Sequence, residues 1–259
     1  MLINKEIIEC ELEYTKCFSR FYENEDIVRF HDDELKDMYD HNYTYLKKAM
    51  SEIKLKEVLN NEISLRLSEK GSFCNIILNF EINNTIFSML EFSPEISTNG
   101  YYIFDISKFS KLKSVPGCII QKVSNQEMVE DVLFCNLKHA EEVLGKDFCT
   151  KKCYRRGKIY IADEGIDSYI CYHNGEIIGN CDLFIFNGVA KIEDFAVIPL
   201  YQRRGYGTTI LKALIDVAIK QDCHTIYLVA DEDDTAKEMY EKISFKKVGE
   251  RTDLFFELY

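Results

Sequence analysis

The most informative part of the sequence is DFAVIPLYQRRGYGTTILKAL, which spans residues 194–214. An apolar strand ends at Pro199, an apolar helix begins near Thr208, and Gly205 and Gly207 lie between them, just after two arginines. The chain has only twelve glycines in 259 residues. One glycine is sufficient for a turn, so a second one beside positive charge at a helix start indicates that this loop binds an anion.

Phosphate is the anion that such a loop favours. The first backbone N–H groups of a helix lack acceptors within the helix and carry a partial positive charge, and glycines let the preceding loop turn its amides inward. Two common phosphate loops are excluded. Neither Gly145-Lys146 nor Gly157-Lys158 is followed by the Ser or Thr of a Walker loop, and Ile210 stands where the dinucleotide fingerprint requires a third glycine.

The composition, 46% hydrophobic and 29% charged, is that of a globular protein. No segment is apolar enough to span a bilayer and residues 1–20 are charged throughout, so we expect a cytoplasmic protein with no signal peptide and no membrane partner. The formal net charge of −12 argues against a nucleic-acid partner and mildly favours small or cationic substrates. The ten cysteines are expected to be reduced, and Cys149-x-x-x-Cys153 lacks a complementary pair, so we expect no metal.

The order of elements predicts an α+β fold divided near Pro116-Gly117, into residues 1–116 and 117–259. In the second part we expect a strand at 118–123, a helix at 125–144, and three antiparallel strands joined at Asn174-Gly175 and Asn187-Gly188. A helix at 208–221, a strand at 225–230, a helix at 234–243 and a final strand at 254–259 complete it.

The first part is harder to interpret. Its first sixty residues are charged and are expected to be helical, with His31 and His41 solvated among acids rather than bound to metal. Strands are predicted at 63–67, 73–82, 85–92 and 100–106, with a hairpin at Asn83-Asn84.

Two motifs in the second part resemble those of the GNAT superfamily of N-acetyltransferases. Gln202-x-x-Gly205-x-Gly207 is similar to the coenzyme A pyrophosphate loop of that family. DDTAKEMYEKISF, residues 233–245, is similar to its helix motif, with Ala236, Tyr240 and Phe245 in register, although Asp233 replaces the usual asparagine and Ser244 the usual glycine. The resemblance covers roughly residues 117–259. It implies the acyl-CoA N-acyltransferase fold, a central mixed, mostly antiparallel sheet flanked by helices.

The resemblance also implies where acetyl-CoA would bind: between the strands 190–198 and 225–230, with its pyrophosphate on the glycine loop. Asp233, Ala236 and Tyr240 belong to the second motif. The implied cofactor-binding residues of the strand and the loop are Phe195, Ala196, Val197, Gln202, Arg203, Arg204, Gly205, Tyr206, Gly207, Thr208 and Thr209.

Three catalytic roles are implied as well. An alkyl ammonium with a pKa of about 10 must lose a proton before it can attack, and Glu193 is the favoured base, with Asp194 as the alternative. Alternation places these two acids on opposite faces of a strand, but a bulge that the family has there makes this count unreliable. The Val197 amide would polarise the thioester carbonyl. Tyr240 would protonate the leaving thiolate, although its spacing also fits a core aromatic residue.

The resemblance therefore predicts an N-acetyltransferase that transfers the acetyl group of acetyl-CoA to the primary amine of a small molecule, as a monomer or homodimer. Acetylation of protein N-termini or lysines stays open, and so does a non-catalytic sensor or scaffold that only binds acyl-CoA. For residues 1–116 two alternatives stand: a degenerate GNAT-like copy that walls one side of the acceptor site, or an unrelated α+β recognition domain.

Overall fold

The computed structural model describes residues 3–233 and 235–258. The first part of the chain comprises α1 (Lys5–Lys16), β1 (Arg20–Glu23), β2 (Ile27–His31), β3 (Tyr43–Leu46), α2 (Glu52–Ser68), β4 (Phe73–Leu78) and β5 (Glu95–Phe104). Three 3-10 turns accompany these elements: η1 (Tyr39–His41), η2 (Asn84–Met89) and η3 (Ile106–Lys111).

The second part follows the predicted order with one addition. It comprises β6 (Cys118–Lys122), α3 (Gln126–Leu144), α4 (Lys146–Ala162), β7 (Ile166–His173), β8 (Glu176–Phe186), β9 (Val189–Val197), η4 (Pro199–Tyr201), α5 (Tyr206–Lys220), β10 (Thr225–Asp231), α6 (Ala236–Lys242) and β11 (Phe245–Glu257). The predicted order of helices and strands in this part is thereby confirmed, except that β11 begins at Phe245, well before the predicted start of the final strand at 254, and that α4 was not predicted.

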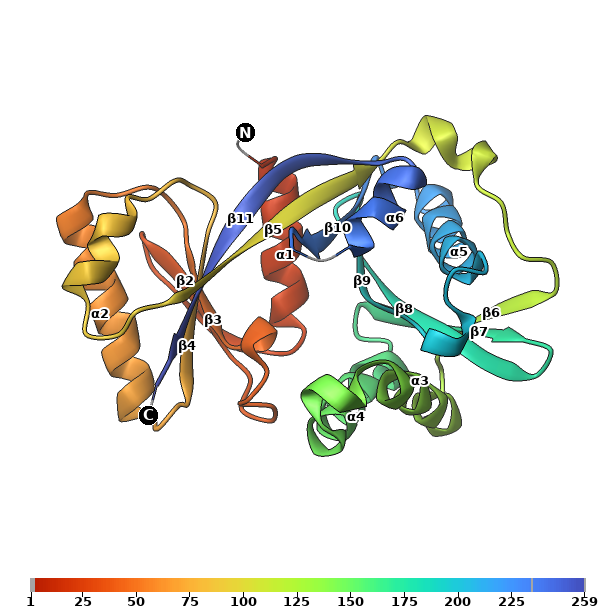
Figure 1. Cartoon of the computed structure of the whole chain (residues 1–259), viewed down its shortest axis with the longest axis horizontal. Helices are drawn as coiled ribbons and strands as arrows, with labels where there is room; N and C mark the ends of the chain where they lie inside the picture. Colours follow the sequence, from red (N-terminus) through yellow and green to blue (C-terminus); the bar gives the residue numbers. More distant parts are fainter. Residues whose placement is uncertain (1–2, 234, 259) are drawn as a thin grey trace.

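All eleven strands form one sheet, in the order β1-β2-β3-β4-β11-β5-β10-β9-β8-β7-β6. β5 and β11 form its centre and cross between the two halves of the molecule (Figure 1). β5 comes from the first part of the chain but pairs with β10 of the second. Conversely, β11 pairs with β4 of the first part. Each half of the sheet is therefore completed by a strand from the other part of the chain.

The two halves repeat one topology. In the first half, the antiparallel strands β1–β3 are followed by helix α2 and then by β4, which pairs in parallel with β3. In the second half, the antiparallel strands β7–β9 are followed by helix α5 and then by β10, which pairs in parallel with β9. The next strand of the sheet is β11 beside β4 in the first half and β5 beside β10 in the second. Each of these two strands is antiparallel to its neighbour and comes from the other part of the chain. The pair β5–β11 then closes both halves.

Helices cover both faces of the sheet. α5 packs on one face of the second half through Ile210, Leu211 and Leu214, while α1, α3 and α4 pack on the other face. In the first half, α2 covers β4 and the end of β11. Helix α1 lies in the middle of the molecule, beside the central strands (Figure 1). No described helix is both long and apolar enough to cross a bilayer.

Four predictions for the first part were wrong. The first sixty residues, which were expected to be helical, contain the strands β1, β2 and β3 between α1 and α2, and these strands pair with one another. Residues 63–67 belong to α2, because Ile63 continues the buried face that begins at Leu55 and Leu59. Residues 85–92 contain the 3-10 turn η2 rather than a strand, so Asn83-Asn84 joins no hairpin; Asn83 instead caps η2. His41 is not solvated but 1% exposed, since it stacks on Phe18 and bonds Asp32.

The cysteines of the described chain are all free. Cys149 and Cys153 are buried, where they pack in the interior beside α3. Asp234, at the start of the predicted helix 234–243, and Tyr259, at the end of the predicted final strand, lie outside the described residues.

Candidate active site

The strands β9 and β10 separate at the position where the cofactor was expected. They pair in parallel only from Val189–Thr225 to Ile192–Leu228, although β9 continues to Val197 and β10 to Asp231. Beyond Ile192 the edge of β9 that faces β10 therefore has no strand partner among residues 3–233 and 235–258. An extended ligand can be added at such an edge through backbone hydrogen bonds.

A bulge shapes this edge. The register between β8 and β9 shifts between Asn180 and Asp182, and Asp194 adopts a left-handed φ of 48°. The Asn180 amide donates to the carbonyl of Asp194 at 3.1 Å and holds the bulge in place. Further along, the Ile198 N–H donates to Ile178 O, so by alternation the peptide groups of Val197 point to the open edge.

The glycine loop forms a turn in front of α5. Arg203 and Gly205 both have positive φ, 61° and 87°. The first intrahelical bond runs from the Thr209 amide to Gly205 O, so the amides of residues 206–208 precede it and lack an acceptor within the helix. Arg203 and Arg204 are exposed, and no acidic group of the described chain lies within 4 Å of either. These features fit a pyrophosphate.

Three side chains of the predicted loop set are engaged within the protein. The Gln202 amide donates to Val197 O at 3.1 Å, which fixes the loop to the end of β9. The Tyr206 hydroxyl bonds His173 Nδ1 at 2.9 Å. The Thr209 hydroxyl donates to Gly205 O and accepts from the Val115 amide, both at 2.9 Å. These residues hold the loop in shape.

Gly207 is close to β9 and α6. A Cβ atom there would lie 3.2 Å from Phe195 Cζ and 3.3 Å from Met239 Sδ. Phe195 is half-buried, while Ala196 and Val197 are buried, and Thr208 lies one position past Gly207 in the first turn of α5.

Helix α6 brings Tyr240 to the same region. Tyr240 is 9% exposed, and its ring lies 6.4 Å from Phe195 and 6.0 Å from Phe245. The structure thus brings Tyr240 to the open edge of β9 and also gives it core contacts. Ala236 opens α6, and the amide of Asp233 donates to Asp231 Oδ1 at 2.8 Å.

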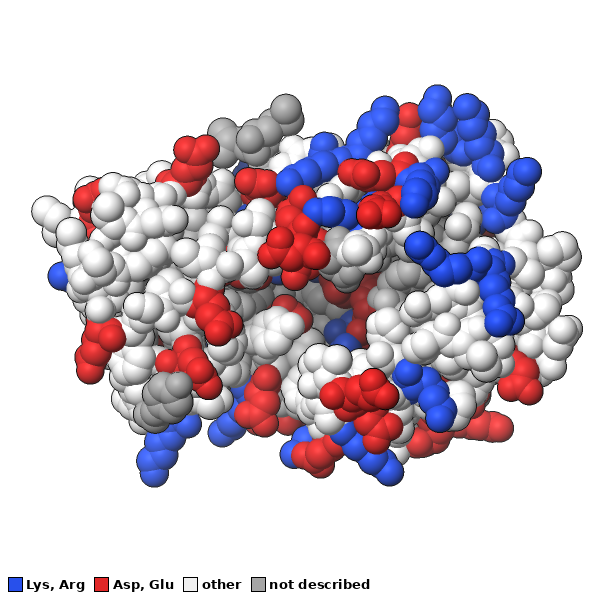
Figure 2. Space-filling model, in the orientation of Figure 1, with Lys and Arg blue, Asp and Glu red and all other residues white. Residues whose placement is uncertain are grey.

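A cavity of about 300 Å³ opens where β9 and β10 separate. Glu193 and Asp194 line it from β9, and Val229 and Asp231 from β10, while α1 and the segment 38–43 close it from the first part of the chain. Figure 2 shows the corresponding hollow between the two halves of the molecule. The cavity lies in the size range of small-molecule sites.

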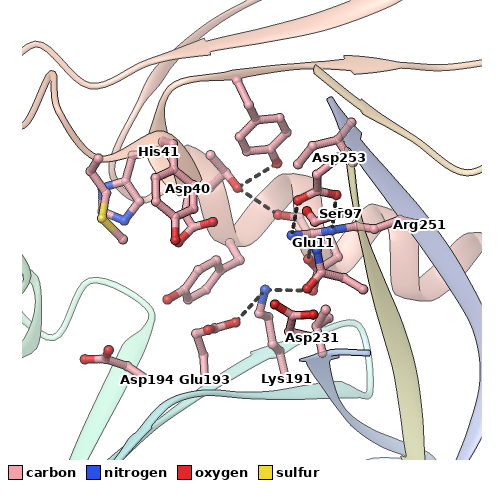
Figure 3. Close-up of a pocket in the computed structure, with 18 of the residues that line it drawn as sticks. Glu11, Asp40, His41, Ser97, Lys191, Glu193, Asp194, Asp231, Arg251 and Asp253 are labelled. Carbon is pink, nitrogen blue, oxygen red and sulfur yellow. Dashed lines mark hydrogen bonds and ion pairs between the residues drawn. The ribbon is translucent and has the colours of Figure 1, made fainter. Parts of the chain in front are cut away.

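The lining of the cavity is strongly charged. It carries six carboxylates: Glu11, Asp40, Glu193, Asp194, Asp231 and Asp253. It carries four cationic side chains: Lys152, Arg156, Lys191 and Arg251. Several of these groups form the ion-paired chain drawn in Figure 3. Glu11 is at its centre and contacts Lys191 at 2.7 Å and Arg251 at 3.2 Å.

Glu193 and Asp194 both line the cavity, and the bulge with its left-handed φ at Asp194 breaks the simple alternation of faces in β9, as the resemblance implied. Burial alone would raise the pKa of Glu193, but its 2.9 Å ion pair with Lys191 outweighs this and lowers it. Lys152 and Arg156 likewise lower the pKa of Asp194 against the effect of burial. Both acids are ionised at neutral pH. The side chain of Glu193 is a third exposed and pairs with one cation, Lys191. The side chain of Asp194 is less exposed and pairs with two cations, Lys152 and Arg156.

Sequence reasoning missed most of this lining. Glu11, Asp40 and Arg251 lie far apart in the sequence and come together only because α1, η1 and β11 meet at the centre of the sheet. Lys191 carries a local signal: a lysine within the apolar strand VAKIEDFAV requires a buried carboxylate partner. Across the described residues, no group of three or more His, Cys, Asp or Glu is arranged to hold a metal.

Sequence comparison finds known proteins that are similar to part of this chain. The profile of the acetyltransferase (GNAT) family matches residues 135–245. An N-acetyltransferase of Bacillus subtilis without a characterised activity, CgeE, is 35% identical over 109 residues, which are 40% of this chain and 42% of the relative. The [ribosomal protein bS18]-alanine N-acetyltransferase of Haemophilus influenzae is 30% identical over 82 residues, 32% of this chain and 56% of the relative. The chain thus spans about half the length of these relatives.

Structural comparison covers the whole chain. A GCN5-related N-acetyltransferase from Kribbella flavida superimposes with a TM-score of 0.75 at 12% identity, over 100% of this chain and 97% of that one. At this identity the likeness concerns the fold alone. The first part of the chain, which the family profile does not reach, is included in the superposition.

Proposed function

We propose that the chain, whose residues 135–245 match the acetyltransferase (GNAT) family profile, is a member of that family and transfers the acetyl group of acetyl-CoA to the primary amine of a small molecule. One observation carries the proposal: the opening between β9 and β10 has the glycine loop at its end and the charged cavity at its start. A thioester lying along this opening would connect the two. The donor and the acceptor would then meet beside Glu193.

The proposed donor site uses backbone groups of β9 and α5. The amides that precede the first bond of α5 would bind the pyrophosphate, with Arg203 and Arg204 adding positive charge. The peptide N–H of Val197 points to the open edge, where it would bond the pantetheine arm or the thioester carbonyl. The carbonyl oxygen of Val197 already accepts a hydrogen bond from the Gln202 side chain, so this oxygen is not proposed as a partner of the pantetheine arm.

The proposed chemistry needs two proton transfers. The ammonium of the acceptor gives a proton to Glu193, directly or through water, and the lowered pKa of this acid keeps it ionised and able to accept the proton. The free amine then attacks the thioester carbon and the C–S bond breaks. The thiolate takes a proton from the Tyr240 hydroxyl, whose ring lies 6.4 Å from that of Phe195. Asp194, held by Lys152 and Arg156, would position the bulge rather than accept the proton.

We further propose that the first part of the chain is a degenerate copy of the second. The repeated strand order and the exchange of β5 and β11 support this reading. The loop between β3 and α2 occupies the position of the glycine loop, yet it reads KKAMS and has no glycine. This copy would therefore not bind coenzyme A, and would instead supply the acceptor wall through α1 and residues 38–43.

Release of free thiol from acetyl-CoA in the presence of a panel of amines tests the proposal. We expect amine-dependent release, with one acetylated amine formed for each thiol. Binding of acetyl-CoA without turnover for any amine would favour the sensor. Acetylation of peptide N-termini in preference to every small amine would contradict the small acceptor and make the chain a protein acetyltransferase.

A further inference from the structure

The charges of the cavity do not balance. The four cationic groups are each held by a carboxylate: Lys191 by Glu193, Arg251 by Asp253, Lys152 by Asp194 and Arg156 by Asp182. Two carboxylates, those of Asp40 and Asp231, have no Lys or Arg within 4 Å in the part of the chain that is described. The lining of the cavity is therefore short of positive charge, although Asp231 Oδ1 does accept from the Asp233 amide.

Asp40 faces the cavity from the wall opposite β9. It belongs to η1 and lies across the cavity from Glu193 and Lys191 (Figure 3). More than a third of Asp40 is exposed to solvent, but desolvation of its carboxyl in the cavity, together with Glu193 and Asp253, raises its pKa to about 6, so the site favours neutralisation of this group. A bound cation would neutralise it at neutral pH. The ring of Tyr39, which also lines the cavity, adds an aromatic face next to it.

His41 provides a second, independent observation. It is 1% exposed and lines the cavity beside Asp40 (Figure 3). Its Nδ1 donates to Asp32 Oδ2 at 3.0 Å, and that carboxylate also binds Arg155. The neutral ring therefore keeps a lone pair on Nε2, and this buried atom has no hydrogen-bond partner among the described residues. Burial lowers the pKa of His41 to about 4, so the lone pair persists at neutral pH.

Asp40 and His41 are consecutive residues that both line the cavity, and a carboxylate together with a lone pair requires a donor with positive charge. A protonated amine supplies both the N–H groups and the charge. The reacting amine cannot serve this purpose, because it must be neutral when it attacks beside Glu193. We propose that the acceptor is an aliphatic diamine, whose second ammonium binds between Asp40 and His41 while its first amine is acetylated beside Glu193. This inference rests on the proposed function.

Turnover and binding of matched amines test it. Linear diamines of three to six carbons are compared with the alkyl monoamine and the ω-amino acid of the same length, using thiol release and calorimetry on the full chain. We expect kcat/KM for the preferred diamine to exceed that of its monoamine by about tenfold or more, the range of a hydrogen bond to a charged group. The ω-amino acid should be the poorest, because its carboxylate meets Asp40.

Two variants assign the effect to the site. Asp40→Asn should remove the preference for the diamine and weaken its binding about tenfold. Asp37→Asn removes the same charge from a neighbouring exposed position outside the cavity, and this variant should keep both the preference for the diamine and the affinity for it. His41→Phe keeps a flat ring on Phe18 without the lone pair and should weaken diamine binding as well.

The outcomes separate this inference from the proposed function. Equal use of diamine and monoamine, preference for the amino acid, or an unchanged preference in Asp40→Asn would overturn the diamine while leaving an N-acetyltransferase. Diamine binding that depends on Asp40 without any turnover would support the site and contradict the enzyme. Failure of every diamine to bind would overturn the inference outright.

Discussion

Removal of the Glu11 carboxylate should destabilise the whole fold. Glu11 lies on α1 and is 7% exposed. Its Oε1 contacts Lys191 Nζ and accepts from the Tyr227 hydroxyl, each at 2.7 Å, while its Oε2 contacts Arg251. Burial alone would lower the pKa of Lys191, but Glu11 and Glu193 raise it, so the lysine stays charged. Glu11 therefore compensates two buried cations from the other part of the chain.

The expected loss in the free energy of unfolding depends on which carboxylate partners Lys191 and Arg251 retain. Loss of one partner from a buried ion pair costs about 3–5 kcal/mol. Lys191 retains Glu193 and Arg251 retains Asp253, which places Glu11→Ala near the lower end of that range. The Tyr227 hydroxyl loses its acceptor at the same time and adds roughly 1 kcal/mol. We therefore expect a loss of about 3–4 kcal/mol in the free energy of unfolding.

Urea denaturation of the purified chain measures this loss, and Glu9→Ala is the matched control. Glu9 lies on the same helix and pairs at 3.1 Å with Lys5, but both side chains are well exposed. Such pairs contribute about 0–1 kcal/mol, so the control should unfold close to the wild type. Equal, small losses in both variants would refute the view that Glu11 joins the two parts of the chain.

Three further predictions concern the site. Gly205→Ala should weaken coenzyme A binding more than tenfold in calorimetry, because a left-handed φ costs an L-residue about 1–2 kcal/mol and a Cβ would meet Val115; Gly145→Ala, at a glycine outside the loop with a φ of 79° and open space around the added Cβ, is the control, and equal affinities would contradict the loop's role. Tyr240→Phe should keep cofactor affinity and lose about 10²–10⁴-fold in turnover, whereas a loss confined to affinity would make Tyr240 a packing residue. Calorimetric affinity for a diamine should fall as pH drops below about 6, since Asp40 becomes protonated and loses the charge that attracts the ammonium; an unchanged affinity at pH 5 would contradict this.

Local sequence signals were sufficient for most of the second part of the chain. Asn174-Gly175 and Asn187-Gly188 mark hairpins between strands that do pair, and the apolar face of α5 follows from its period. The exception is α4, whose sequence KDFCTKKCYRRGKIYIA is rich in charge and has a weak apolar stripe. Its buried face relies on Arg156, which is paired with Asp182 on β8, and this partner is not visible from the helix alone.

The first part of the chain could not be predicted in the same way. In α2, Glu62 and Arg66 are buried because Arg29 and the carbonyl of Phe30 on β2 bind them, so the apolar period is broken by residues that tertiary contacts satisfy. The exchange of β5 and β11 leaves no local signal, since a strand sequence does not specify which edge it joins. The glycine loop was predictable, whereas the acceptor cavity is built from residues that only the complete sheet brings together.

Calorimetric titration of the full chain with acetyl-CoA tests the central claim most directly. We predict that one molecule of acetyl-CoA binds per chain, at the opening between β9 and β10, and that Gly205→Ala weakens this binding more than tenfold. Two molecules per chain would contradict the degenerate first part, and one molecule whose affinity ignores Gly205 would contradict the proposed cofactor site.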